Sequence, residues 1–220
     1  MIDGPRMPPA AGGKPNALIV LCHGYGSNGD DLIGLAPYWA RVLPHAQFVS
    51  PHAPEPLPGM PGAYQWWGLG RPDPGGAGVT RAASILDKFL DEELYRYGLD
   101  DSRLALVGFS QGTMISLHTG LRRQRPPAAI LGFSGMLTAP DRLKDEMRGA
   151  PPICLIHGDQ DDRIPLTAMF KAADALCEVG LSAQWHISYG IGHSIAPDGL
   201  DLGGAFLKMA LKKQAAVVAA

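Results

Sequence analysis

Short apolar runs alternate along this chain with longer segments in which apolar residues recur every three or four positions. Several runs are almost continuous in Val, Ile, Leu and Ala, as expected of strands buried on both faces of a parallel sheet. We therefore predict a strand over each run. The runs are Ala17–Cys22, Gln47–Ser50, Arg103–Val107, Ala128–Phe133, Ile153–Ile156 and Ala183–Ser188.

The segments between the runs have helical periodicity. In Arg81–Tyr97, apolar residues fall on one face of a helix, and Gly98 follows as a C-terminal cap. The other predicted helices are Gln111–Leu121, Leu166–Val179 and Leu200–Lys213. This alternation of strands and helices predicts an α/β fold, in which helices cover both faces of a mostly parallel central sheet.

Glycine and proline gather in two segments that break the alternation. The 220 residues include 28 Gly and 20 Pro; seven of these lie in residues 1–15, and seven Pro and seven Gly lie in residues 51–78. We expect residues 1–15 to form a flexible leader and residues 16–220 a single domain. A loop as long as 51–78 inside a compact domain is usually functional or mobile, so we expect it to lie beside the substrate.

Composition and charge narrow the class of protein. Hydrophobic residues make up 46% of the chain, too many for a disordered protein. The net charge of −2 and the scattered basic residues indicate no nucleic-acid partner. The three cysteines, Cys22, Cys154 and Cys177, are spaced for neither a disulfide framework nor a zinc knuckle. Residues 1–15 lack the apolar stretch of a secretory signal.

The apolar runs are also too short for a membrane protein. The longest have six residues, whereas a membrane-spanning helix needs about 20. We therefore expect a cytoplasmic protein without stable membrane insertion.

The clearest chemical motif is Gly108-Phe109-Ser110-Gln111-Gly112, which fits G-x-S-x-G. It follows a predicted buried strand and opens a predicted helix, the setting of a nucleophile elbow. Side chains in place of the two glycines would collide with neighbouring backbone in so tight a turn. This context predicts that Ser110 is a nucleophile presented at the carboxyl end of the sheet.

A serine hydroxyl needs a general base to become a nucleophile. His193 follows Gly190 and Gly192 in the loop after the last predicted strand, and this loop position makes it the best candidate base. His118 and His186 fall within regular elements and are expected to be structural. In folds with such an elbow the chain order is Ser, acid, His, which His193 satisfies.

The acid is expected after the strand Ile153–Ile156. Three aspartates compete there, Asp159, Asp161 and Asp162, and one of them must accept a hydrogen bond from Nδ1 of the histidine. Spacing alone does not choose among them.

An oxyanion hole is expected to complete the site. Its donors should be the backbone N–H after the nucleophile, that of Gln111, and one N–H from the glycine-rich loop after the first strand, His23–Asp31. A phosphate-binding turn is disfavoured there because neither G-x-G-x-x-G nor a P-loop lysine is present.

These motifs as a set resemble the carboxylesterase/phospholipase family of α/β hydrolases, which includes acyl-protein thioesterases. The resemblance runs from about residue 16 to residue 212. It rests on His23–Asp31, Gly108–Gly112, His157–Pro165 and Gly192–Ser194.

The resemblance implies roles for particular residues. The family's H-G-x-x-D-x-x-V-P pattern falls on Asp161 as the acid, with Ile164 at the Val position, and the family's oxyanion loop places the second donor N–H at Tyr25. Two positions depart from the family pattern: Thr113 replaces a glycine after the elbow, and Gly68 replaces an Asp after Trp66-Trp67.

The expected activity is hydrolysis of carboxylic esters of short to medium acyl chain through an acyl-enzyme, without metal or cofactor. The substrate is a small ester or lipid-like molecule, and the resemblance allows a homodimer. We expect six residues to bind the acyl group. They are Trp66, Trp67, Leu69, Met136, Leu137 and Ile164.

Two alternative functions share these residues. A lysophospholipase or acyl-protein thioesterase would use the same catalytic groups and differ only in its groove. A non-catalytic binding protein could also be built on this fold, because fold alone does not give activity. A dienelactone hydrolase is disfavoured because it would carry Cys where Ser110 stands.

Overall fold

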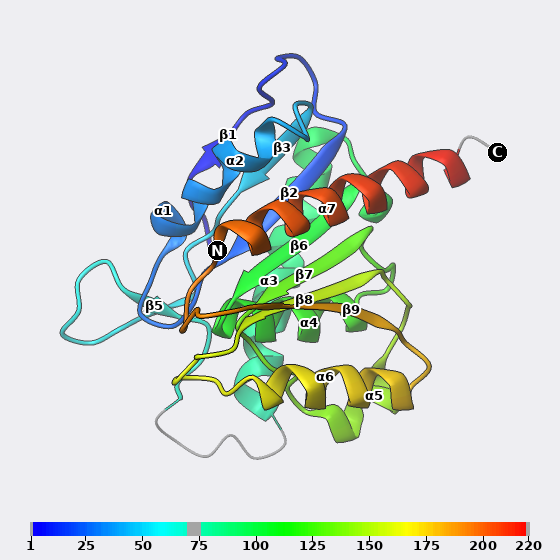
Figure 1. The fold of residues 1–220 in the computed structure, drawn as a ribbon. Helices are drawn as coiled ribbons and strands as arrows, with labels where there is room; N and C mark the ends of the chain where they lie inside the picture. The colour runs from blue at the N-terminus through cyan, green and yellow to red at the C-terminus, as the bar shows by residue number, and fades with distance from the viewer. Residues whose placement is uncertain (1, 70–75, 219–220) are drawn as a thin grey trace.

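The protein is built around a seven-stranded, mostly parallel sheet (Figure 1). The computed structural model describes residues 2–69 and 76–218, with side chains described as far as Lys212. β1 runs antiparallel to β3, and the other strands run parallel to one another. In spatial order the strands are β1 (Arg6–Met7), β3 (Ala46–Val49), β2 (Ala17–Cys22), β6 (Leu104–Phe109), β7 (Ala129–Phe133), β8 (Ile153–Gly158) and β9 (Ala183–Ser188).

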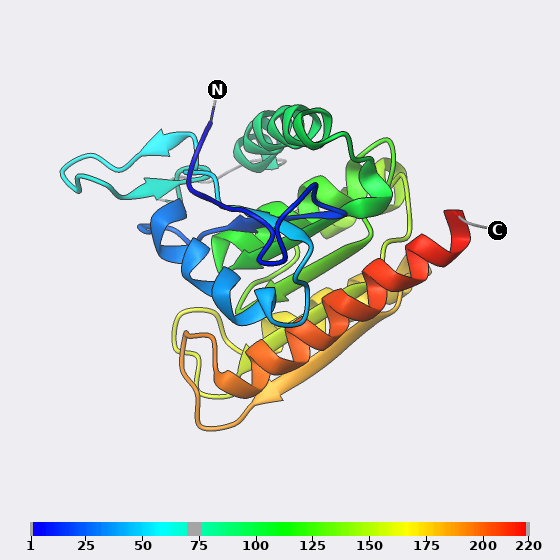
Figure 2. The same cartoon turned by 90° about the horizontal axis from the view of Figure 1, so that it is seen from above.

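Helices cover both faces of the sheet, as Figure 2 shows from above. One face carries α1 (Gly29–Leu32), the 3-10 turn η1 (Ile33–Leu35), α2 (Ala36–Ala40) and α7 (Pro197–Val218). The other face carries α3 (Ala77–Tyr97), α4 (Gln111–Arg122), α5 (Pro140–Glu146) and α6 (Thr167–Glu178). This arrangement confirms the predicted fold class.

The continuous apolar strands are explained by this double covering. In β2, Ile19 and Leu21 pack with Trp39 of α2 and with α7, whereas Leu18 and Val20 pack toward α3. Successive side chains of a strand point to opposite faces, so a strand between two helical layers needs apolar residues at every position. Trp39 also donates a hydrogen bond from Nε1 to the Leu200 carbonyl, over 2.9 Å.

Three short α-helices were not predicted from the sequence. Helices α1, α2 and α5 have four, five and seven residues, too few for a periodic pattern to be recognised. The predicted long helices are present, but α3 begins at Ala77 rather than Arg81, and α7 begins at Pro197 rather than Leu200.

The amino-terminal segment differs from the expected flexible leader. Its strand β1 pairs with β3, and Ile2 is buried. Arg6 binds the carboxylate of Glu93 on α3, with Nη2 2.7 Å and Nε 3.1 Å from its oxygens. Glu93 is itself buried. The pairing of β1 with β3 and the Arg6–Glu93 ion pair therefore hold the amino-terminal segment against the domain, although its glycines and prolines predicted a flexible leader.

The glycine- and proline-rich loop 51–78 is partly structured. It contains a small hairpin of β4 (Glu55–Pro56) and β5 (Tyr64–Gln65). Tyr64 exchanges backbone hydrogen bonds of 2.9 Å with Ser27 and Gly26, which ties the hairpin to the loop after β2. Residues 70–75 of the predicted loop lie outside the described residues.

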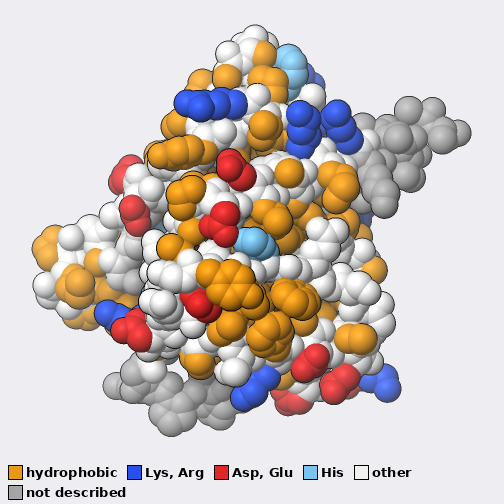
Figure 3. Space-filling model, in the orientation of Figure 1, with side chains coloured by type: hydrophobic (Ala, Val, Ile, Leu, Met, Phe, Trp, Pro, Cys, Tyr) orange, Lys and Arg blue, Asp and Glu red, His pale blue; other side chains and the backbone are white. Residues whose placement is uncertain are grey.

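Charged side chains of both signs are interspersed over the face of the molecule seen in Figure 3, in keeping with the small net charge. Within residues 2–69 and 76–218, none of the helices combines the length and apolar character needed to cross a bilayer.

Candidate active site

Ser110 stands in a strained turn between β6 and α4. Its backbone has φ 55° and ψ −118°, a conformation that L-residues avoid and that persists only when its surroundings enforce it. A Cβ on Gly108 would lie 2.2 Å from the Gly112 carbonyl oxygen, and one on Gly112 would lie 1.7 Å from the Cys22 carbonyl oxygen. Both glycines of the motif are therefore required by close backbone contact.

Thr113 stabilises the turn that carries Ser110. Its hydroxyl oxygen lies 2.8 Å from the carbonyl oxygens of both Gly108 and Phe133, and the Phe133 carbonyl also accepts the Ser110 N–H over 2.9 Å. A Cβ on Gly132 or Gly135 would come within 2.4 Å of the Thr113 side chain. The residue that departs from the family pattern thus joins the ends of β6 and β7 to the first turn of α4.

The structure distinguishes the three competing aspartates. Asp161 accepts hydrogen bonds from the backbone N–H groups of Arg163 and Ile164, over 3.0 and 2.9 Å, and from Nδ1 of His193 over 2.8 Å. Asp159 instead accepts the Gly190 N–H, and the Asp162 side chain is 85% exposed. Of the three aspartates, Asp161 is therefore the one that the structure brings to His193.

The electrostatics of Asp161 favour its ionised form. Burial acts to raise the pKa of this carboxyl, but hydrogen bonds from the Ile164 N–H, from His193 and from the Arg163 N–H outweigh burial and hold the pKa below its ordinary value. An ionised Asp161 can fix His193 with its proton on Nδ1, which leaves Nε2 free to accept a proton.

Two aromatic side chains, Phe109 and His157, contact the His193–Asp161 pair. Neither of them was assigned a role from the sequence. The ring of Phe109 packs against His193 with 4.9 Å between centroids. His157 lies buried with Nε2 2.8 Å from the Ile164 carbonyl and 3.2 Å from the Asp161 carboxylate. His157 stood within the quoted family motif, but its spacing of four residues from Asp161 did not by itself reveal the contact.

The expected oxyanion donors lie beside the nucleophile. Among the described residues, the backbone N–H groups of Tyr25 and Gln111 donate to no other group. A Cβ on Gly24 would lie 3.3 Å from the Ser110 Cβ, so the loop after β2 passes close to the elbow. Two unpaired N–H groups at this position can stabilise a developing negative charge.

The side chain of Gln111 has a second part in the site. Its Oε1 accepts the Trp66 N–H over 2.9 Å, and its Nε2 donates to the Trp67 carbonyl over 2.8 Å. The first residue of α4 therefore holds the segment that carries both tryptophans.

His23 is a structural histidine beneath the oxyanion loop. Its Nε2 accepts the Ala53 N–H over 2.9 Å, and its Nδ1 lies 2.7 Å from the Gly24 carbonyl. Burial lowers the pKa of His23 to about 4. The ring is therefore neutral near pH 7.

This buried histidine predicts a loss of stability in mild acid. Between pH ~6.5 and pH ~4 the unfolded chain binds a proton at His23 that the folded chain does not, so the free energy of unfolding falls as pH is lowered, by about 3 kcal/mol in all. Urea denaturation at pH 7.0, 5.5 and 4.5 measures the change, and an NMR titration of the ring assigns it. A His23 that titrates above pH 6 in the folded protein would contradict the prediction.

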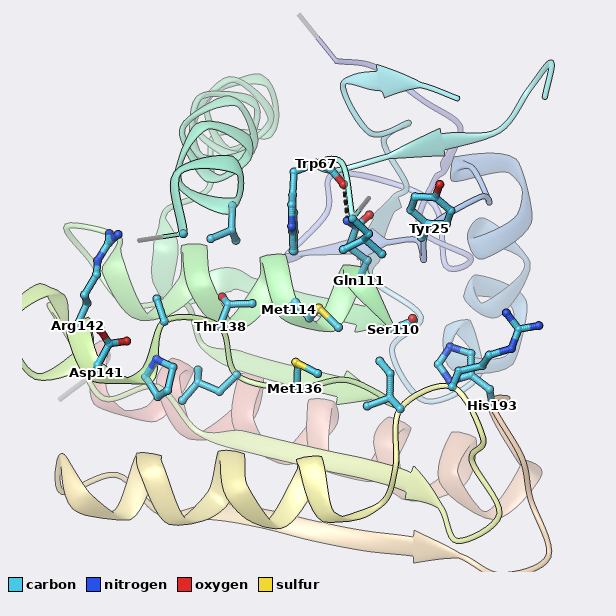
Figure 4. Close-up of a pocket in the computed structure, with 18 residues that line it drawn as sticks. Tyr25, Trp67, Ser110, Gln111, Met114, Met136, Thr138, Asp141, Arg142 and His193 are labelled. Carbon is cyan, nitrogen blue, oxygen red and sulfur yellow. Dashed lines mark hydrogen bonds between the residues drawn. The ribbon is translucent and has the colours of Figure 1, made fainter. Parts of the chain in front are cut away.

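Ser110, His193, Tyr25 and Gln111 all line one cavity of about 780 Å³. Figure 4 shows Ser110, His193 and Tyr25 at one end of it, with Asp141 and Arg142 at the other. Met114, which sequence reasoning missed, lines the stretch between the two ends.

Five of the six expected acyl-binding residues line this cavity. They are Trp67, Leu69, Met136, Leu137 and Ile164. Trp66 does not, and for this residue the prediction is wrong. Its side chain is 1% exposed, packs against His23 and donates from Nε1 to the His23 carbonyl over 2.9 Å. These adjacent residues, which follow the end of β5, face opposite ways, so one tryptophan supports the loop and the other faces the cavity.

Within the described part of the chain, no group of three or more His, Cys, Asp or Glu side chains is arranged to hold a metal ion. Cys22 and Cys154 are buried, and burial raises the pKa of each thiol to about 12. These thiols are therefore poor nucleophiles and poor metal ligands.

The sheet, the elbow and the Asp–His pair after the later strands define an α/β hydrolase with a serine nucleophile motif. Residues 9–211 match the model of the Phospholipase/Carboxylesterase family, and the chain belongs to that family. The resemblance noted in the motifs is thereby confirmed, and the protein is a serine hydrolase of this family.

Solved and curated proteins give more detail. The structure is similar to that of esterase PE8, with a TM-score of 0.89 and 43% identity over 95% of this chain and 99% of that one. The sequence is 29% identical to acyl-protein thioesterase 1 of Emericella nidulans, over 84% of this chain and 86% of that protein. It is 28% identical to acyl-protein thioesterase 1 of Saccharomyces cerevisiae, over 88% and 92%.

Proposed function

We propose that this protein hydrolyses carboxylic esters of short to medium acyl chain through a covalent acyl-enzyme. Ser110 attacks the carbonyl carbon while Nε2 of His193 takes its proton, and the same nitrogen returns the proton to the leaving alcohol. A water molecule, activated by His193, then releases the acid. Asp161 orients His193, and the N–H groups of Tyr25 and Gln111 hold the oxyanion.

The observation that carries this proposal is the 2.8 Å contact between His193 Nδ1 and the buried Asp161, together with a cavity that both His193 and Ser110 line. A general base oriented by a buried carboxylate beside a serine on an elbow is the arrangement that acyl transfer needs. The likeness to esterase PE8 at 43% identity favours an ester as the substrate.

An acyl-protein thioesterase or lysophospholipase activity is the second candidate. The curated relatives named acyl-protein thioesterase 1 favour it, at 27–29% identity. The two candidates differ in leaving group, so matched butyrate esters, butyryl thioesters and short-chain lysophospholipids distinguish them. A kcat/KM at least tenfold higher for the simple butyrate esters than for the thioesters and the lysophospholipids supports the first candidate, and a preference for either of the latter supports the second.

A fluorophosphonate probe tests the covalent mechanism itself. Reaction of the wild-type protein should add one probe mass to the peptide that contains Ser110. Absence of labelling under conditions that label a control serine esterase would instead support a non-catalytic binding protein.

Replacement of Trp67 by alanine should change the acyl-chain preference. The Trp67 side chain is 5% exposed and lines the cavity, so its loss opens space for longer chains. Each additional buried methylene is worth about 0.8 kcal/mol, or roughly fourfold in kcat/KM. We expect the optimum across C2 to C12 p-nitrophenyl esters to move to longer chains. Trp185→Ala, on the exposed strand β9, is the matched control, and an unchanged Trp67→Ala profile would exclude this role.

A further inference from the structure

A basic groove lies at the end of the molecule opposite the candidate active site. Its lining comes from residues that precede β2, β3 and β6 and from the carboxyl-terminal half of α7. Ser110 and His193, by contrast, follow the carboxyl ends of strands. The groove has a volume of about 470 Å³. It is lined by the cationic side chains of Arg41, Arg103, Lys208 and Lys212, together with His45 and apolar residues.

The positive charge of this groove is not neutralised. Within the described part of the chain, no Asp or Glu is among its lining residues, and none of its four cations forms an ion pair. Arg103 is held by carbonyl oxygens instead, those of Asn16 and Leu211. Four unpaired cations in one place are a marked local excess in a chain whose net charge is −2.

The groove also has an apolar part. A strip of apolar residues, Val42, Leu43, Pro44 and Leu211, lines it together with the cations, and Val42 is 37% exposed. In Figure 3, Lys and Arg side chains gather at the upper end of the visible face, near the carboxyl-terminal half of α7. Cations around an apolar strip match a phosphate-bearing headgroup with its adjoining acyl region.

The path of α7 favours a lipid surface, rather than a small soluble anion, as the ligand of the basic groove. Figures 1 and 2 both show its carboxyl-terminal turns projecting beyond the sheet. The sequence after Lys212 continues with another lysine, Lys213, and ends in six apolar residues, 215–220. Three of the groove's cations, Arg41, Lys208 and Lys212, have exposed side chains that a broad anionic surface can reach, whereas a site for a free phosphate would need donors that converge on one point.

We propose that this basic groove binds the protein peripherally to anionic lipid surfaces. The phosphate and carboxylate groups of the headgroups pair with Arg41, Arg103, Lys208 and Lys212, and the apolar strip meets the acyl boundary. Because the groove and Ser110 lie at opposite ends of the parallel strands, the bound protein presents its catalytic cavity to the aqueous phase. The interaction is electrostatic and therefore weakens with salt.

Vesicle sedimentation tests this proposal. The wild-type protein should bind vesicles of 70% phosphatidylcholine and 30% phosphatidylserine at low salt, and should bind pure phosphatidylcholine vesicles far more weakly. Each cation near such a surface contributes about fivefold to the partition coefficient, so Lys208→Ala/Lys212→Ala should lower it by about 25-fold. Lys88→Ala/Lys144→Ala makes the same change of charge on exposed lysines of α3 and α5, and should lower it less than twofold.

Other results would overturn the proposal. These are equal binding to both kinds of vesicle, no binding to either, or equal losses in the two double variants. Equilibrium dialysis with inorganic phosphate and with glycerophosphoserine separates the sources of the anion. Binding of these soluble compounds without binding of vesicles assigns the groove to a free phosphate and rejects the lipid surface. Ester hydrolysis by every variant serves as the check that each has folded.

Discussion

Replacing Ser110 by alanine is expected to lower kcat for p-nitrophenyl butyrate by about 10⁶, because the attacking atom is lost while the rest of the site remains. The residual rate should come from the oxyanion donors and from binding alone. The hydroxyl faces the cavity, so its removal leaves no packed core group without a partner, and the melting temperature should barely change. Steady-state kinetics and a thermal melt measure the two effects.

Ser134 offers a matched control. It also has a positive φ, of 46°, at the end of the neighbouring strand, and it is buried, but it does not line the cavity. Ser134→Ala should retain activity within a few-fold. If Ser110→Ala kept a tenth of the wild-type activity, or if both variants lost activity equally, the assignment of Ser110 as nucleophile would fail.

Replacing Asp161 by asparagine should lower kcat by about 10⁴. The carbonyl oxygen of an asparagine would accept the two backbone N–H groups that Oδ1 now accepts, those of Arg163 and Ile164. Its NH₂ group would then face Nδ1 of His193, which would have to give up its proton to accept the hydrogen bond. The ring would carry its proton on Nε2 instead, and could no longer accept one from Ser110.

Asp162 provides the control that separates the effect on the His193 tautomer from a general change in charge. Asp162 is largely exposed, and its contact with Arg163 is 4.0 Å, so Asp162→Asn should change kcat less than twofold. A tautomer effect also predicts that KM for the ester stays within a few-fold in Asp161→Asn. Equal losses in the two variants, or a loss in KM alone, would contradict the role given to Asp161.

Much of the site could be predicted because it depends on residues close together in the sequence. The elbow needs a buried strand, two glycines and a helix start within a few residues of Ser110, and each of these leaves a local pattern. The order of Ser110, Asp161 and His193 follows from parallel strands whose carboxyl ends meet at one edge. Spacing could not choose between Asp159, Asp161 and Asp162, because only the hydrogen bonds of the folded loop distinguish them.

The features that could not be predicted depend on contacts between residues far apart in the chain. The bond from Arg6 to Glu93 joins residues 87 positions apart, and no local pattern indicates it. Trp66 and Trp67 are identical in type and adjacent, so their opposite orientations appear only when Gln111 and His23 are placed around them. Short helices such as α2 are stabilised by the sheet on which they pack rather than by their own propensity.

The two hydrogen bonds from the Gln111 side chain have a consequence for any redesign of this protein. The residue whose N–H faces the oxyanion position also holds the backbone of Trp66 and Trp67, so a change in the tryptophan segment moves the start of α4 as well. Mutations selected there for a new acyl group will therefore alter turnover too, and a second substitution elsewhere will be needed to restore it. Met136 lies on the opposite wall of the cavity (Figure 4) and, within the described part of the chain, forms no hydrogen bond to the elbow, so it is a better position for changing selectivity alone.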